Sequence, residues 1–138
     1  MAVLGAERME QIPACLVRYS IANPFMQAME VIPRPSPVAG VREAYAVYIT
    51  GESMIPEFEP GDLAIVNPHL PPIAGVTCIF YGETGGTAHA TIKRLRRQTQ
   101  DAWHVRQWNP PAGMKEDFTL GRAEWPICHR TVGKHSRR

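Results

Sequence analysis

Cysteine is scarce in this sequence. Its 138 residues include three, Cys15, Cys78 and Cys128, with no Cys-x-x-Cys spacing. A sparse, odd-numbered set argues against a disulfide framework and fits a reducing compartment. Cys78 and Cys128 lie in apolar runs, where packing in the core is the better interpretation. We therefore expect a cytoplasmic protein without structural disulfides.

Long hydrophobic runs are also missing. No apolar stretch approaches the roughly 18 residues that a membrane span requires. The start, MAVLGAERME, lacks the charged segment and long apolar stretch of a secretion signal. These observations predict a soluble protein with no membrane partner.

Strong net charge is a third absence. The formal charge is +2, so the chain as a whole shows no preference for nucleic acid. Two basic runs, KRLRR at Lys93–Arg97 and GKHSRR at the C-terminus, are interpreted as solvated faces.

Helical periodicity does not extend beyond single turns, whereas strand signals recur. Short segments rich in β-branched and aromatic residues are separated by Gly, Pro and Asn. This pattern predicts a mainly β domain with a curled or barrel-like sheet. Strands are expected at residues 44–50, 62–67, 75–82, 88–95, 101–108 and 125–133.

Proline is abundant in the first 40 residues. Because proline restricts φ and interrupts helices, this region predicts an extended arm with one short helix near Phe25–Glu30. The PRPSP stretch that follows is typical of a linker. We therefore predict a proline-rich arm or linker at residues 1–40 and a folded domain at residues 41–138.

The stretch TGESMIPEFEPGDLAIVNP, residues 50–68, places Ser53 at the end of a predicted strand. A serine hydroxyl is a weak nucleophile unless a base removes its proton. The five histidines are scattered, and none has metal-ligand spacing to another His or Cys. The sequence thus predicts neither a histidine base nor a metal or cofactor site.

Lysine is the other candidate base. Strand alternation in ATIKRL places Lys93 on the same face as Thr91 and Leu95. Burial there would lower the pKa of Lys93, and a neutral amine could deprotonate Ser53. The spacing alone leaves the alternatives open, namely an ordinary turn serine and a surface lysine.

The two segments together resemble the LexA-like self-cleaving peptidase domain, the family of LexA, phage repressor C-terminal domains and UmuD. Three motifs carry the resemblance: Gly51-Glu52-Ser53-Met54, Gly61-Asp62 and Lys93-Arg94-Leu95. It covers roughly residues 41–133, and the ending QWNPP…HRTVG looks most like prophage repressors. The resemblance implies a mainly β peptidase fold, with curled antiparallel sheets and few short helices.

The resemblance also implies roles for individual residues. Ser53 would be the nucleophile and Lys93 the general base of a Ser-Lys serine peptidase. The backbone N–H groups of Glu52 and Ser53 would form the oxyanion hole. The family cleaves its own chain at an Ala-Gly or Cys-Gly bond upstream of the serine, and the one Ala-Gly upstream of Ser53 here is Ala39-Gly40.

That bond lies much closer to the serine than the family places it. The residues from Gly40 to Ala44 span at most about 14 Å, whereas a straight strand over 44–50 is roughly 20 Å long. Ala39-Gly40 could therefore reach only the Ser53 of another copy, and no other cleavage bond is evident.

The implied functions concern transcriptional regulation of the prophage or SOS type. Family members with a working cleavage site respond to a RecA filament. The proline-broken start of this chain shows no helix-turn-helix, so direct DNA binding is not expected from it. We expect a homodimer, with a full-length repressor as a further candidate partner.

Three alternatives remain open. One is a UmuD-like accessory of a translesion polymerase. Another is a catalytically silent domain that serves dimerisation or partner binding. The third is a signal-peptidase-like enzyme, which the lack of a membrane anchor disfavours.

Overall fold

Nine strands form one sheet in the computed structural model, which describes residues 14–20, 30–33, 40–41 and 43–136. For β1 and β2 the description is limited to the backbone. The strands are β1 (Ala14–Ser20), β2 (Glu30–Pro33), β3 (Tyr45–Tyr48), β4 (Leu63–Asn67), β5 (Thr77–Thr84), β6 (Thr87–Gln98), β7 (Ala102–Arg106), β8 (Asp117–Gly121) and β9 (Ile127–His135).

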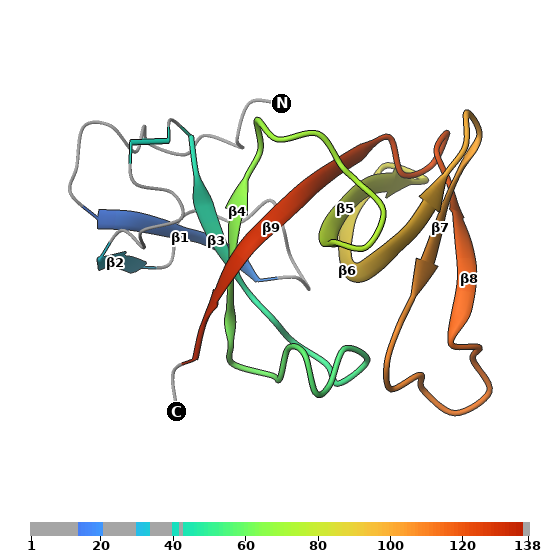
Figure 1. The fold of residues 1–138 in the computed structure, drawn as a ribbon, viewed down its shortest axis with the longest axis horizontal. Coiled ribbons are helices and arrows are strands. Elements are labelled where there is room, and N and C mark those ends of the chain that lie inside the picture. The colour runs from blue at the N-terminus through green and yellow to red at the C-terminus, as the bar shows by residue number, and fades with distance from the viewer. Residues whose placement is uncertain (1–13, 21–29, 34–39, 42, 137–138) are drawn as a thin grey trace.

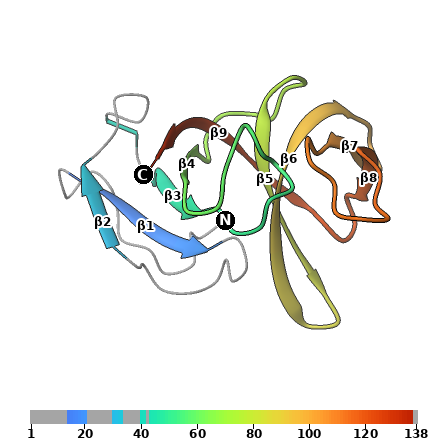
Figure 2. The ribbon, with the colours of Figure 1, turned by 90° about the horizontal axis from the view of Figure 1, so that it is seen from below.

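The last strand joins the two halves of the sheet. Its order is β2-β1-β3-β4-β9-β5-β6-β7-β8. In Figure 1, β9 crosses the molecule between the group β1–β4 and the group β5–β8. Its end near His135 pairs with β4, and its start near Ile127 pairs with β5. Figure 2 shows β1 and β2 at one end of the molecule and β7 and β8 at the other.

The predicted mainly β class is confirmed, and all six predicted strands are present. Two differences concern detail. The described residues contain no helix, so the expected few short helices are not seen there. The helix predicted near Phe25–Glu30 lies outside the described residues except for Glu30, which begins β2.

The predicted arm contributes to the sheet. β1 pairs in parallel with β3, while the other pairings are antiparallel. A parallel neighbour requires a long connection, and residues 21–44 provide one between β1 and β3. The strand pattern at β8 was missed, because Phe118 and Leu120 give only two apolar positions in an otherwise polar run.

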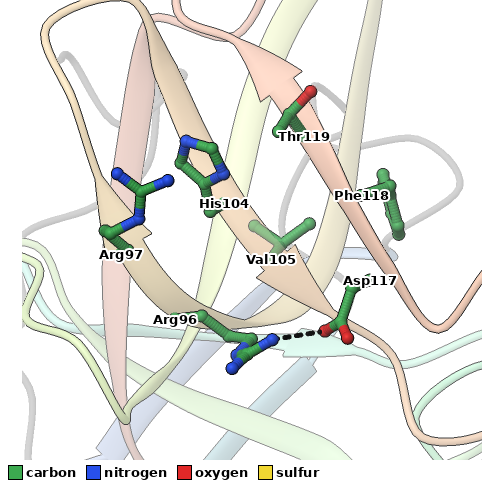
Figure 3. A pocket seen from close by; sticks show the side chains of 7 residues that line it. All are labelled: Arg96, Arg97, His104, Val105, Asp117, Phe118 and Thr119. Atoms are coloured by element: carbon green, nitrogen blue, oxygen red, sulfur yellow. Dashed lines mark ion pairs between the residues drawn. The ribbon is translucent and has the colours of Figure 1, made fainter.

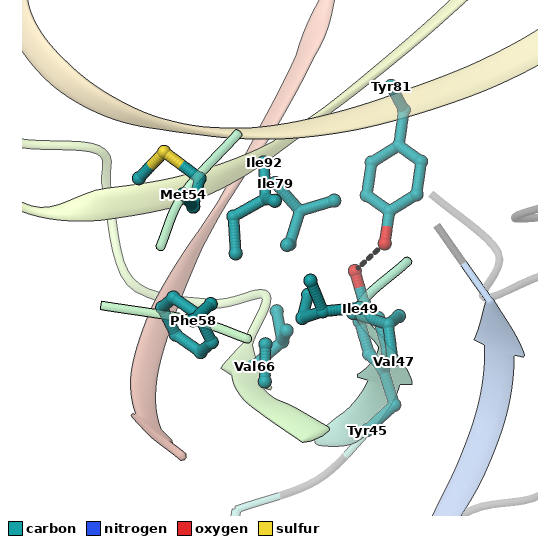
Figure 4. Close-up of a cluster of buried hydrophobic side chains, with 10 residues drawn as sticks. Tyr45, Val47, Ile49, Met54, Phe58, Val66, Ile79, Tyr81 and Ile92 are labelled. Carbon is teal, nitrogen blue, oxygen red and sulfur yellow. Dashed lines mark hydrogen bonds between the residues drawn. The ribbon is translucent and has the colours of Figure 1, made fainter. Parts of the chain in front are cut away.

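The core is divided by the sheet into three clusters. Strands β3 and β4 are buried on both faces, so alternate side chains enter different clusters. The first cluster contains Tyr45, Val47, Ile49, Met54, Phe58, Ala64, Val66, Ile79, Tyr81 and Ile92, most of which are labelled in Figure 4. Cys78 and Cys128 pack in the cluster around Phe80 and Trp103, which confirms their predicted core role.

A buried polar network is built into the first cluster. The hydroxyl oxygens of Tyr45 and Tyr81 lie 2.6 Å apart (Figure 4), and the Tyr45 hydroxyl lies 2.6 Å from Nδ1 of His129. These bonds link β3, β5 and β9. Burial lowers the pKa of His129 to about 4, so its imidazole is neutral at pH 7.

The buried imidazole predicts acid sensitivity. Because the folded pKa of His129 lies below the unfolded value of 6.5, its contribution is complete above pH 6.5 and is lost as the pH falls toward 4. The loss amounts to about 3 kcal/mol. Urea unfolding of wild type and of His129→Gln between pH 7 and 4 measures it. An equal pH dependence in the two proteins would contradict the assignment.

A second prediction concerns close packing at Gly82. A Cβ added at Gly82 would overlap the backbone carbonyl oxygen of Glu124, whereas one added at Gly121 lies 4.0 Å from the Glu124 side chain. Overpacking against backbone costs roughly 1–3 kcal/mol. Chemical denaturation should therefore show Gly82→Ala destabilised by that amount, and the control Gly121→Ala within about 0.5 kcal/mol of wild type.

Candidate active site

The turn between β3 and β4 carries Ser53. Gly51 begins it with a φ of +80°, a conformation that favours glycine. The backbone N–H of Ile55 then donates to the Glu52 carbonyl, and the N–H of Phe58 donates to the Met54 carbonyl. Met54 and Phe58 are buried in the first core cluster. The turn is thereby anchored by two buried side chains that follow the half-buried Ser53.

The Gly61-Asp62 motif closes this turn. The Gly61 N–H donates to the Ile49 carbonyl, and the Ile49 N–H donates to the Asp62 carbonyl. The fully buried Asp62 accepts the Glu59 N–H on its carboxylate at 2.9 Å. This motif residue therefore holds the shape of the turn.

The structure brings the two predicted dyad residues together. Lys93, on β6, donates from Nζ to the Ser53 Oγ at 3.0 Å. Its residue exposure is only 7%, so it is not the surface lysine that the spacing had left open. Burial lowers the pKa of Lys93 from 10.5 to about 8, because desolvation disfavours the ammonium form.

This arrangement can support base catalysis near neutral pH. With a pKa of about 8, about 10% of the amine is neutral at pH 7 and about 90% at pH 9. A neutral Nζ within hydrogen-bond reach can accept the proton of the Ser53 hydroxyl. The described geometry thus places a candidate base in contact with the serine, and burial makes its neutral form accessible at slightly alkaline pH.

Glu57 anchors the serine turn to other parts of the chain. The sequence analysis did not single out this residue. Its carboxylate accepts from Thr77 Oγ1 and from Trp108 Nε1, both at 2.8 Å. It also forms an ion pair with Arg94 at 3.2 Å. Three parts of the chain therefore converge on a residue four positions after Ser53.

Asn109 contacts the turn next to the nucleophile. Its backbone N–H donates to the Ser53 carbonyl at 2.9 Å, and its Nδ2 donates to the Glu52 carbonyl at 3.0 Å. The residue belongs to the QWNPP segment, so the family resemblance is the one sequence signal that could have drawn attention to it. Its distance of 56 positions from Ser53 hides the contact from any local pattern.

The other predicted site residues have mixed outcomes. Glu52 is exposed beside Ser53, and the oxyanion role of the Glu52 and Ser53 N–H groups stays a prediction. Ala39 lies outside the described residues, and Gly40 is exposed. The Ala39-Gly40 cleavage bond therefore stays a prediction.

Several hollows lie beside the strands that form the site, one of about 390 Å³ at Pro56, Glu57, Arg94 and Trp108. A groove of about 700 Å³ borders the serine turn at Pro56–Phe58 and β9 at Arg130–Lys134. A third hollow of about 410 Å³ lies on β6–β8, and Figure 3 shows its lining: Arg96, Arg97, His104, Val105, Asp117, Phe118 and Thr119.

The predicted solvated face of the basic run is found at this third hollow. Arg96 and Arg97 are exposed there. Arg96 pairs with Asp117 at 3.1 Å (Figure 3), so part of the basic charge is neutralised. Arg94 points elsewhere, toward Glu57 and Trp108.

Neither a metal cluster nor a membrane-spanning helix is found in the described part of the chain. No cluster of three or more His, Cys, Asp or Glu side chains there could hold a metal ion. Nor do the same residues include a helix of the length and hydropathy needed to cross a membrane.

Comparison with known proteins finds a family and a relative. Residues 9–123 match the protein family described as Peptidase S24-like. The chain is also similar to Repressor protein C of Rhizobium phage 16-3, with 31% identity over 96 residues. That match covers 66% of this chain and 36% of the repressor. No solved structure matches the chain significantly.

The buried lysine predicts a stability cost. Because the folded pKa of Lys93 is about 8 and lies below the unfolded value, wild type gains stability as the pH rises from 8 to 10.5, by about 3 kcal/mol. Lys93→Met keeps the apolar stem without the charge. We expect it to be about 1–3 kcal/mol more stable than wild type at pH 7, and the gain to shrink toward pH 10.5.

Chemical denaturation of both proteins across this pH range tests the prediction. A variant less stable than wild type at pH 7 would show that the ammonium form is well solvated at this position.

Proposed function

The chain belongs to the Peptidase S24-like family, and we propose that it is a serine peptidase of the LexA and phage-repressor type with Ser53 and Lys93 as its dyad. The observation that carries this proposal is the 3.0 Å contact between Lys93 Nζ and Ser53 Oγ. The lowered pKa of the buried amine supports it. The reaction is hydrolysis of a peptide bond.

The first step forms an acyl-enzyme. Neutral Lys93 accepts the hydroxyl proton of Ser53 while Oγ bonds to the carbonyl carbon of the scissile peptide. As the tetrahedral intermediate collapses, the carbon–nitrogen bond breaks. The leaving amine takes the proton from the Lys93 ammonium, and an ester links the substrate to Ser53.

Water completes the reaction. Neutral Lys93 accepts a proton from water as its oxygen attacks the ester carbon. The ester bond breaks, and the Ser53 oxygen recovers the proton. The dyad is thus restored without any group other than the substrate and water.

The oxyanion of each tetrahedral intermediate needs hydrogen-bond donors. Within the proposal, these are the backbone N–H groups of Glu52 and Ser53, at the start of the turn. Such donors are effective because a rigid turn fixes them before charge develops. The buried side chains of Met54 and Phe58 supply that rigidity.

The proposed biological setting is regulation of transcription. The support is the similarity to a phage repressor, which covers 36% of that protein. Within this proposal, the substrate is a peptide bond in a repressor-type chain, either a second copy of this protein or a full-length repressor. Homodimerisation would bring such a bond to the dyad in trans, and exposed Gly40 marks the first bond to test.

Mass spectrometry of the purified protein tests the proposal. Wild type, Ser53→Ala and Lys93→Met are incubated at pH 7 and pH 9. We expect a fragment in wild type alone, formed about tenfold faster at pH 9, because the neutral fraction of a lysine of pKa about 8 rises about tenfold between these values.

The pH profile separates this dyad from an unshifted lysine. The rate should level off above pH 9, whereas a base of ordinary pKa would continue to accelerate toward pH 10.5. Intact masses for all three proteins at both values would contradict self-cleavage. They would favour the alternative of a silent binding domain.

A further inference from the structure

The orientation of the Glu52–Ser53 peptide decides where the Ser53 N–H points. A trans peptide is planar, and its C=O and N–H groups point in opposite directions. A donor that holds the Glu52 carbonyl on one side therefore directs the Ser53 N–H to the other. That N–H is one of the two oxyanion donors in the proposed function.

Asn109 supplies such a donor from a distant part of the chain. Its Nδ2 holds the Glu52 carbonyl at 3.0 Å, and its own N–H holds the Ser53 carbonyl at 2.9 Å. The Ile55 N–H also reaches the Glu52 carbonyl, at 3.2 Å, but it belongs to the turn and moves with it. Asn109 lies outside the turn, and it thus holds both peptide units that flank the Ser53 side chain in place relative to the rest of the fold.

The segment that carries Asn109 is itself fixed. Gln107 is buried, and its Nε2 donates to the Lys115 carbonyl at 2.7 Å. Its backbone N–H donates to the Glu116 carbonyl at 2.9 Å. The next residue, Trp108, donates from Nε1 to Glu57 at 2.8 Å. Three consecutive residues therefore connect the end of β7 rigidly to the nucleophile turn.

We propose that Asn109 is a positioning residue for the oxyanion hole, and this inference rests on the proposed peptidase function. It acts through the Glu52–Ser53 peptide. Without its side chain the turn retains the Ile55 contact and the backbone bond from residue 109 to the Ser53 carbonyl, but the Glu52 carbonyl loses its outside donor and the Ser53 N–H loses its fixed direction. The reaction should then slow at every pH, without a change in the protonation of Lys93.

A reaction that needs no knowledge of the natural substrate tests this role. A fluorophosphonate reacts with an activated serine: Oγ bonds to phosphorus, the phosphorus–fluorine bond breaks, fluoride leaves, and the hydroxyl proton passes to the amine of Lys93. The phosphoryl oxygen occupies the oxyanion position. Intact-mass measurement then gives the labelling rate from pH 6 to pH 10.

Two variants provide the comparison. Asn109→Leu has a similar size but no side-chain donor. Trp108→Phe removes the Nε1 bond to Glu57 in the same segment and leaves the Asn109 donor in place. We expect Asn109→Leu to lower the plateau rate about tenfold, with the midpoint still near pH 8. This is less than the 10²–10³ typical for complete loss of an oxyanion donor. Trp108→Phe should retain a plateau within about threefold of wild type.

The outcomes separate the two levels of the proposal. If wild type is labelled and Asn109→Leu is labelled at the same rate, the positioning role alone is overturned. A loss of rate that follows thermal stability equally in both variants, or a shifted midpoint in Asn109→Leu, overturns it as well, since a general loosening of the site would then explain the effect. No labelling of wild type, as for Ser53→Ala, overturns the peptidase function from which the inference proceeds.

Discussion

The burial of the Lys93 amine is the constraint on which the candidate site depends. Lys93 is 7% exposed and lies 3.0 Å from a serine oxygen, and burial lowers its pKa to about 8. A buried ammonium is costly, so the surrounding sheet must be stable enough to tolerate it. Lys93 lies on the long strand β6, which is held in the sheet by pairing with both β5 and β7. Stability elsewhere in the fold thus offsets the local cost of a buried amine with a lowered pKa.

The hydroxyl side of the pair is held by different means. Ser53 lies on a turn, and turns are generally more mobile than strands. Here the turn is fixed by two buried side chains, Met54 and Phe58, and by the carboxylate of Glu57. Asn109 adds two hydrogen bonds to the backbone beside Ser53. The position of Ser53 is therefore fixed by packing and hydrogen bonds although the residue is on a loop.

The sheet holds these parts in register. Strand β9 pairs with β4 at one end and β5 at the other, and so ties the strand that follows the serine turn to the strand that neighbours the lysine. The buried bonds among Tyr45, Tyr81 and His129 link β3, β5 and β9 in the same part of the sheet. A buried polar network of this kind favours one arrangement of strands, because any other would leave its groups without partners.

The local sequence pattern was sufficient to predict most of the strands and the candidate dyad. Alternating β-branched and aromatic residues predicted six strands, since side-chain period and turn residues are properties of neighbouring positions. The paired motifs around Ser53 and Lys93 predicted the candidate dyad. The pattern failed at β8, where Phe118 and Leu120 are too few to mark a strand, and it did not predict that β1 would join the sheet beside β3.

Tertiary structure decided the chemistry of the site. Whether Lys93 is a solvated charge or a weakened base depends on its burial, which no spacing reveals. The contacts of Glu57 with Trp108 and of Asn109 with the Ser53 backbone join residues more than 50 positions apart. Chain neighbours determine which strands can form, but a pKa and the direction of a peptide N–H are set by whatever the fold brings within a few ångströms.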